Sequence, residues 1–131
     1  MTITEIADIS TISKTIKNNI MEIKLGKIES VKFGLCGYDD CEIGLSVTLS
    51  NGSWYVSDFK GYWDAERIKW SKSCQWTEED KDKGYSETMR YISKLLKEAK
   101  VDTIDKLKNI PVEVTFDENK LIVWRILTEV I

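Results

Sequence analysis

Residues 42–52 read EIGLSVTLSNG, and apolar side chains alternate strictly with small or polar ones up to residue 50. Such alternation places every second side chain on one face, so it predicts a β-strand with one buried face. Asn51 and Gly52 follow, and the run Trp54–Val56 begins another extended segment. Asn-Gly between two strands is a strong hairpin signal, because both residues tolerate the positive φ angles of a type I′ turn. We therefore expect a hairpin that turns at Asn51-Gly52.

The segment before this strand, residues 22–35, also reads as extended, with a break at Gly26. Its apolar side chains alternate with Lys32 and Gly34, as expected of a strand. The stretch Gly37–Asp40 has the composition of a turn. Residues 28–60 are therefore predicted to form a three-stranded antiparallel meander.

Residues 61–84 read as a long, irregular connection of polar and aromatic residues, and such connections tend to be functional or mobile. Ser86 has the residue type that caps a helix. Beyond it, apolar residues fall on one face at helical spacing. This face consists of Met89, Ile92, Leu95, Leu96 and Ala99.

The last thirty residues predict a short helical turn followed by a hairpin. Thr103–Leu107 is the expected helical turn, and Pro111 opens a strand with alternating apolar residues. Asp117–Lys120 turns the chain, and Leu121–Val130 is the expected final strand. The layout of meander, helix and hairpin predicts an α+β fold in a single domain over residues 21–131.

Residues 1–20 are expected to form an amphipathic helical arm. Isoleucine recurs in steps of three and four along it, and Thr2 with Glu5 fits a capping box. A solitary helix of this length is marginal in water, so the arm gains most by packing on its own domain or on a partner subunit. We therefore expect a homo-oligomer.

Composition excludes several classes of function. The chain has 131 residues with 31% charged side chains and a net charge of −3, whereas nucleic-acid and membrane-surface binders need a surplus of Lys and Arg. It contains no histidine, which removes the usual general base, the Ser-His and Cys-His nucleophile pairs and the imidazole zinc sites. We expect no enzymatic activity, no metal, no cofactor, no membrane and no direct nucleic-acid partner.

The three cysteines, Cys36, Cys41 and Cys74, are an odd number for a disulfide framework. They favour reduced thiols in a cytosol. A zinc site of three thiolates with Asp39 or Asp40 is the alternative, although the usual Cys-x-x-Cys spacing is missing. Apolar runs of only a few residues and an N-terminus without a basic segment predict no membrane span and no secretory signal.

Aromatic residues concentrate between Trp54 and Tyr91, and the chain has only three arginines. Rings stack on nucleobases, and Arg binds phosphate through two hydrogen bonds. The alternative is a sheet face and a loop cover built from large rings. For a binding site, Gly61 would let a ligand approach the backbone closely. The predicted stacking rings are among Phe59, Tyr62, Trp63 and Trp124, and the predicted phosphate donors are among Arg90 and Arg125.

Four segments give the chain a resemblance to a group of small phage-encoded proteins, the first Thoeris anti-defence family. Residues 27–34 resemble its opening strand and residues 41–49 its second strand. Phe59–Asp64 resembles its stretch rich in glycine and aromatics, and residues 95–108 its helix and turn. The resemblance covers about residues 22–126. The chain departs from the family in a less glycine-rich stretch after the second strand and in a longer loop from Ala65 to Lys83.

The resemblance implies a phage protein that binds and sequesters a cyclic ADP-ribose isomer in the host cytoplasm without cleaving it. The alternative is a protein-binding inhibitor that covers a bacterial defence nuclease. Exposed Trp and Tyr suit such an interface, because these residues anchor protein contacts.

Overall fold

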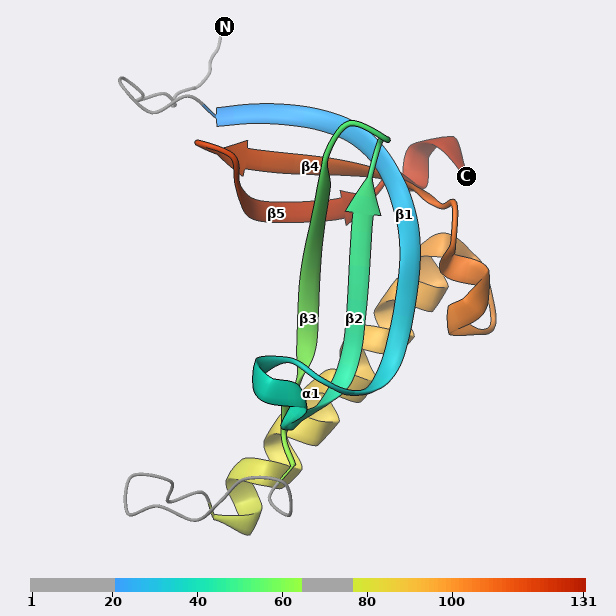
Figure 1. Cartoon of the computed structure of the whole chain (residues 1–131). Helices are drawn as coiled ribbons and strands as arrows, with labels where there is room; N and C mark the ends of the chain where they lie inside the picture. Colours follow the sequence, from blue (N-terminus) through green and yellow to red (C-terminus); the bar gives the residue numbers. More distant parts are fainter. Residues whose placement is uncertain (1–20, 65–76) are drawn as a thin grey trace, which may run out of the picture. The chain divides into compact units, whose positions relative to one another are not determined.

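The structure is a computed structural model that describes residues 21–64 and 77–131. These residues form one five-stranded sheet with the strand order β3-β2-β1-β4-β5, together with one main helix (Figure 1). The expected α+β class is confirmed, whereas the expected arm over residues 1–20 lies outside the described residues. The elements are β1 (Met21–Cys36), η1 (Tyr38–Asp40), β2 (Glu42–Ser50), β3 (Tyr55–Trp63), α1 (Glu78–Ala99), η2 (Ile104–Leu107), β4 (Pro111–Asp117), β5 (Lys120–Ile126) and η3 (Thr128–Val130).

The described residues gather into two compact units. The larger unit comprises Gly26–Val112 with Ile126–Ile131, and the smaller unit comprises residues 21–25 with Glu113–Arg125. Strand β1 contributes to both units and runs without interruption through Gly26, where the sequence predicted a break. The boundary between the units nevertheless falls at this glycine.

The larger unit contains the predicted meander, in which β2 pairs antiparallel with β1 and with β3. The prediction of a type I′ turn at Asn51-Gly52 is wrong. Pairing ends at Ser50 opposite Tyr55, so four residues form the loop, and within it only Gly52 has a positive φ. Side-chain hydrogen bonds favour this wider loop, because Asn51 Oδ1 accepts from the backbone N of Ser53 at 2.9 Å.

Helix α1 begins at Glu78 with Thr77 as its cap, nine residues before the cap that the sequence predicted at Ser86. A capping box fixes this start: Thr77 Oγ1 accepts from the Asp80 backbone N at 3.0 Å, and Asp80 Oδ2 accepts from the Thr77 backbone N at 3.1 Å. The first turn carries three acidic side chains, which the helix dipole favours but which show no apolar periodicity. The apolar pattern therefore missed them.

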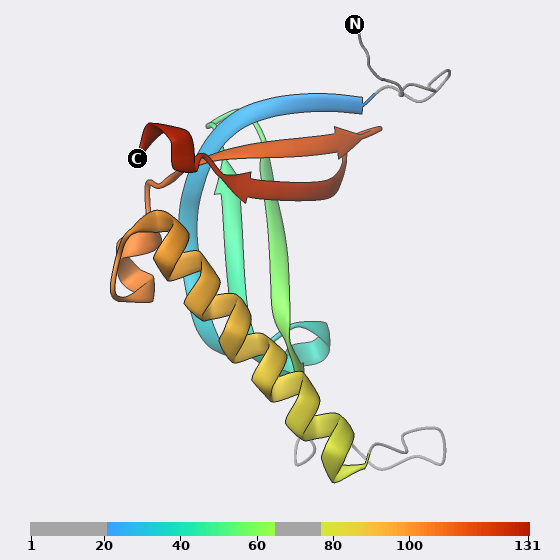
Figure 2. The ribbon, with the colours of Figure 1, turned by 180° about the vertical axis from the view of Figure 1, so that it is seen from behind.

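The buried face of α1 is also rotated from the predicted one. Leu95 and Ala99 are buried as expected, but Met89 is mostly exposed. Figure 2, seen from behind, shows α1 lying across β2 and β3. The helix approaches β3 at Gly84, whose missing side chain leaves room for the ring of Tyr62. The buried residues of α1 are Gly84, Thr88, Leu95 and Ala99.

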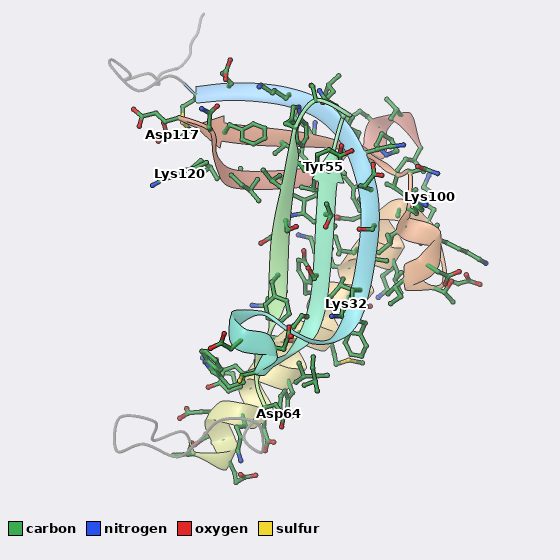
Figure 3. The ribbon with its side chains drawn as sticks, viewed as in Figure 1. Lys32, Tyr55, Asp64, Lys100, Asp117 and Lys120 are labelled. Atoms are coloured by element: carbon green, nitrogen blue, oxygen red, sulfur yellow. The ribbon has the colours of Figure 1, made fainter. Side chains whose placement is uncertain are left out.

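The C-terminal predictions are mostly confirmed. The short helical turn is η2, and β4 and β5 are the two expected strands. Glu118 and Asn119, between the Asp117 and Lys120 that Figure 3 labels, have φ angles of 50° and 69°, as a two-residue type I′ turn requires. The last strand ends at Ile126 instead of Val130, because the Val130 backbone N turns back to the Leu127 carbonyl.

Candidate functional site

The helix covers only part of the meander. Leu45 on β2 pairs with Phe33 on β1 and with Lys60 on β3, and directly paired residues project to the same face. A helix is about 10 Å wide, whereas three strands span about 14 Å. Because α1 packs most closely on β3, the face of β1 that carries Phe33 is left partly open.

A pocket of about 280 Å³ lies in this open part of the larger unit. Its volume lies just below the range of about 300–1,000 Å³ that is typical of small-molecule pockets. Thr88, the one hydroxyl-bearing aliphatic residue of the lining, donates its Oγ1 hydrogen to the Gly84 carbonyl at 2.9 Å, so the pocket presents a mainly apolar surface. The lining residues are Phe33, Ile43, Tyr85, Thr88 and Met89.

Contacts with β3 hold the helix side of the pocket in place. The Tyr85 hydroxyl donates to the Trp63 carbonyl at 3.2 Å, and its ring meets that of Tyr62 edge-on, with the ring centroids 6.1 Å apart. An edge-on pair of rings is a favourable arrangement. The position of Tyr85 is therefore set by both its hydroxyl and its ring.

The pocket continues along α1 as a stripe of apolar side chains. Tyr85 and Met89 are exposed, and Ile92 and Leu96 are half-buried. Their spacing of four, three and four residues places them on one side of a helix, next to its buried face. This stripe, residues 85, 89, 92 and 96, presents apolar surface of the kind found at protein interfaces.

The predicted rings on β3 do not share one face. Phe59 pairs with Ser46 and Trp63 with Glu42, which places both rings on the face turned away from α1. Figure 3 shows that face, with Lys32 and Tyr55 labelled on it. Tyr62 lies on the opposite face, against Gly84 of α1.

The Phe59 ring has a structural contact of its own. A Cβ built on Gly61 would lie only 2.5 Å from Phe59 Cζ, so the ring folds over the glycine. The close approach that Gly61 allows is thus taken up by a ring of the same strand.

The predicted cationic residues are engaged by neighbouring side chains. Arg90 lies exposed on α1 and donates to Ser86 Oγ at 3.0 Å. Arg125 Nε donates to Glu113 Oε1 at 3.0 Å. Trp124 and Arg125 belong to the smaller unit, whereas Phe59, Tyr62, Trp63 and Arg90 belong to the larger one.

No family model, no curated protein and no solved structure matches this chain. The geometry of the molecule is therefore the basis for its functional assignment.

None of the five lining residues was among the site residues predicted from the sequence, for two reasons. Phe33 and Ile43 were assigned to strands, but their partial exposure depends on how far α1 reaches across the sheet. Tyr85 lay before the expected helix start at Ser86, so it was not counted with Met89 as part of a helical stripe. Recognising the capping box at Thr77 and Asp80 would have revealed that pair.

The thiols differ in environment. Cys36 is buried, and burial raises the pKa of its thiol above the ordinary value. Cys41 is half-buried, and Cys74 lies outside the described residues. Within residues 21–64 and 77–131, no three Cys, Asp or Glu side chains gather as a metal ion would require. None of the helices described is both long and apolar enough to cross a membrane.

Proposed function

We propose that this protein acts by binding a protein partner, without catalysing a reaction, and that the pocket between β1, β2 and α1 receives an apolar side chain of that partner. The observation that carries the proposal is the clustering of Phe33, Tyr85 and Met89, which are 49%, 37% and 62% exposed, around one pocket. Aromatic residues and Met are enriched at protein interfaces, where a side chain seated in a pocket often contributes most of the affinity.

The chemistry of the lining supports binding over catalysis. Among the lining residues, the side chain that carries an ionisable group is Tyr85, and its hydroxyl donates a hydrogen bond to the Trp63 carbonyl. General acid–base catalysis needs a group positioned to exchange a proton with a substrate, whereas this hydroxyl already donates to a backbone carbonyl. The class of partner that we propose is a bacterial defence protein, as in the alternative drawn from the sequence.

The second candidate is sequestration of a cyclic nucleotide-type signal such as a cyclic ADP-ribose isomer. Two rings, Phe33 and Tyr85, line the same pocket, and Arg90 follows the lining residue Met89. Stacking on such rings contributes about 1–3 kcal/mol per base. The separation of the predicted residues between two faces of β3 and two units is the reason for placing this function second.

Site-specific crosslinking from position 89 in the bacterial host, followed by identification of the captured protein, provides the partner for a quantitative test. The purified partner is titrated against the wild type, Met89→Glu and Lys83→Glu. The Lys83→Glu control places the same charge on an exposed part of α1 away from the stripe. We expect Met89→Glu to weaken binding at least about tenfold, a difference of 1.4 kcal/mol, and Lys83→Glu to leave it unchanged.

Calorimetric titration with cyclic ADP-ribose isomers and cyclic dinucleotides separates the two candidates. The second candidate would be established if one of these nucleotides binds stoichiometrically to the wild type but not to Phe33→Ala. Heating the complex should then release that nucleotide unchanged. Equal partner affinity of Met89→Glu and the wild type would refute the first. Accumulation of a cleaved product beyond one equivalent per chain would refute both.

A further inference from the structure

The two faces of the smaller unit can be assigned from two contacts. Lys24 Nζ lies 5.4 Å from the centroid of the Phe116 ring, so Lys24 of β1 and Phe116 of β4 share a face. Successive strand residues alternate between faces. The odd-numbered residues of β1 therefore project to the other face, and Met21, Ile23 and Leu25 are each more than half exposed there.

The ion pair between Glu113 and Arg125 extends this second face to β4 and β5. Glu113 is an odd number of residues from Phe116, so it projects to the same side as Ile23. Arg125 meets Glu113 at 3.0 Å and thus lies on that side, as does Val123, two residues earlier on β5. Val123 is also more than half exposed.

One face of the smaller unit, which we call the odd face, thus combines apolar surface with one partly exposed ion pair. Its members are Met21, Ile23, Leu25, Glu113, Val123 and Arg125. Neighbouring large apolar side chains that are more than half exposed mark interaction surfaces, because water is released when they are covered.

We infer that the odd face is a self-association surface whose occupant is the odd face of a second copy of this chain. Most homo-oligomers are two-fold symmetric, and a two-fold axis brings each surface patch against its own copy. The odd face carries both charges of an ion pair, so it is complementary to itself: Glu113 of one copy can meet Arg125 of the other. Two sheet faces pack about 10 Å apart with their side chains interdigitated.

Sedimentation velocity of the full-length chain across micromolar concentrations tests this inference. Ile23→Glu places a charge among the apolar side chains of the odd face, and Ile122→Glu places one at a comparably exposed position on the other face of β5. We expect a dimer for the wild type and for Ile122→Glu. For Ile23→Glu we expect a dissociation constant raised by at least about tenfold. Circular dichroism melts check that each variant is folded.

A charge-exchange experiment tests the two-fold arrangement itself. Glu113→Arg alone and Arg125→Glu alone place like charges opposite each other in a homodimer, so both are expected to dissociate. Mixing the two variants restores opposite charges at both positions of a heterodimer, which is expected to form. A monomeric wild type, equal dissociation of Ile23→Glu and Ile122→Glu, or a mixture that stays monomeric would overturn the inference. A wild type that dimerises only with residues 1–20 present would assign the interface to that segment and also overturn it.

Discussion

At the scale of single residues, Gly84 sets the approach of α1 to the sheet. A Cβ at this position would lie 2.2 Å from Cδ1 of Tyr62, far inside van der Waals contact. Helix propensity alone favours Ala over Gly by about 1 kcal/mol. The ring of Tyr62 opposes that preference, because it is flanked by the helix and by Tyr85.

Gly84→Ala is therefore expected to lower the free energy of unfolding by about 1–3 kcal/mol, the typical cost of overpacking. Urea denaturation measures it, with Glu87→Ala at an exposed position of the same helix as the control. Tyr62→Leu should remove most of the penalty in the double variant. A stabilising effect of Gly84→Ala in the wild-type background would show that the helix stands further from β3.

Cys36 and Cys41 should differ in reactivity. The thiolate is the nucleophile, and burial both shields the Cys36 thiol and raises its pKa. We expect iodoacetamide to modify Cys41 first and Cys36 only as the structure opens. Peptide mapping by mass spectrometry follows each site separately, and 6 M urea should abolish the difference. Faster modification of Cys36 in the native protein would contradict its burial.

At the scale of elements, the start of α1 depends on the reciprocal hydrogen bonds of Thr77 and Asp80. Removing an N-cap side chain costs about 1 kcal/mol of stability. Thr77→Ala is expected to lower the melting temperature measurably, whereas Thr77→Ser keeps the hydroxyl and should melt close to the wild type. Equal melting of both variants would mean that the first turn of α1 contributes little to the folded state.

Tyr91, on α1, is expected to make the free energy of unfolding depend on pH. Burial raises the pKa of its hydroxyl well above the ordinary value, and the carboxylates of Asp58 and Glu98 add to the effect. The unfolded chain therefore loses this proton at a lower pH than the folded chain. The contribution of Tyr91 is fully present below the ordinary tyrosine pKa of about 10 and declines as pH rises beyond it.

Tyr91→Phe should accordingly lose less stability than the wild type between neutral pH and pH 11 or so. Parallel urea titrations at each pH measure the difference, and Tyr55→Phe, an exposed tyrosine at the start of β3, is the control. Identical pH profiles of Tyr91→Phe and the wild type would show that the Tyr91 hydroxyl reaches solvent.

At the scale of the whole molecule, β2 is an interior strand that pairs with β1 and β3 along its whole length, whereas β3 ends the strand order. Hydrogen exchange should therefore be slow at every amide from Leu45 to Leu49. Along β3 it should alternate between slow and fast, since only every second amide of an end strand bonds to its neighbour. Nuclear magnetic resonance resolves this pattern. Uniform protection along β3 would reveal a further strand paired with it in solution.

Much of the fold was predictable from local patterns. The alternation over residues 42–50 identified β2, and the strands on either side followed from their own alternation. The β2–β3 hairpin is present, but the predicted turn type at Asn51-Gly52 was wrong. Side-chain hydrogen bonds within the loop compete with the type I′ turn. The start of α1 was predicted too late because a charged first turn has no apolar periodicity. The residues of its capping box, Thr77 and Asp80, could have been recognised in the sequence.

The pocket was harder to predict from the sequence than the fold. The sequence singled out Tyr62 and Arg90, each of which lies beside a residue that lines the pocket. It grouped them with Phe59, which alternation already places on the other face from Tyr62. Closeness in sequence does not determine which face a strand residue takes, and the grouping of rings rested on that closeness.

By itself, the sequence determined which segments are strands, that a helix follows the meander, and that a chain without histidine has no imidazole chemistry. These properties depend on residue type and spacing, which act over a few residues. Only the tertiary structure decided that Phe33, Tyr85 and Met89 surround one pocket and that Ile23 and Val123 share one face. Exposure depends on what the other elements cover, and one helix set close to β3 by Gly84 is too narrow to cover β1 as well.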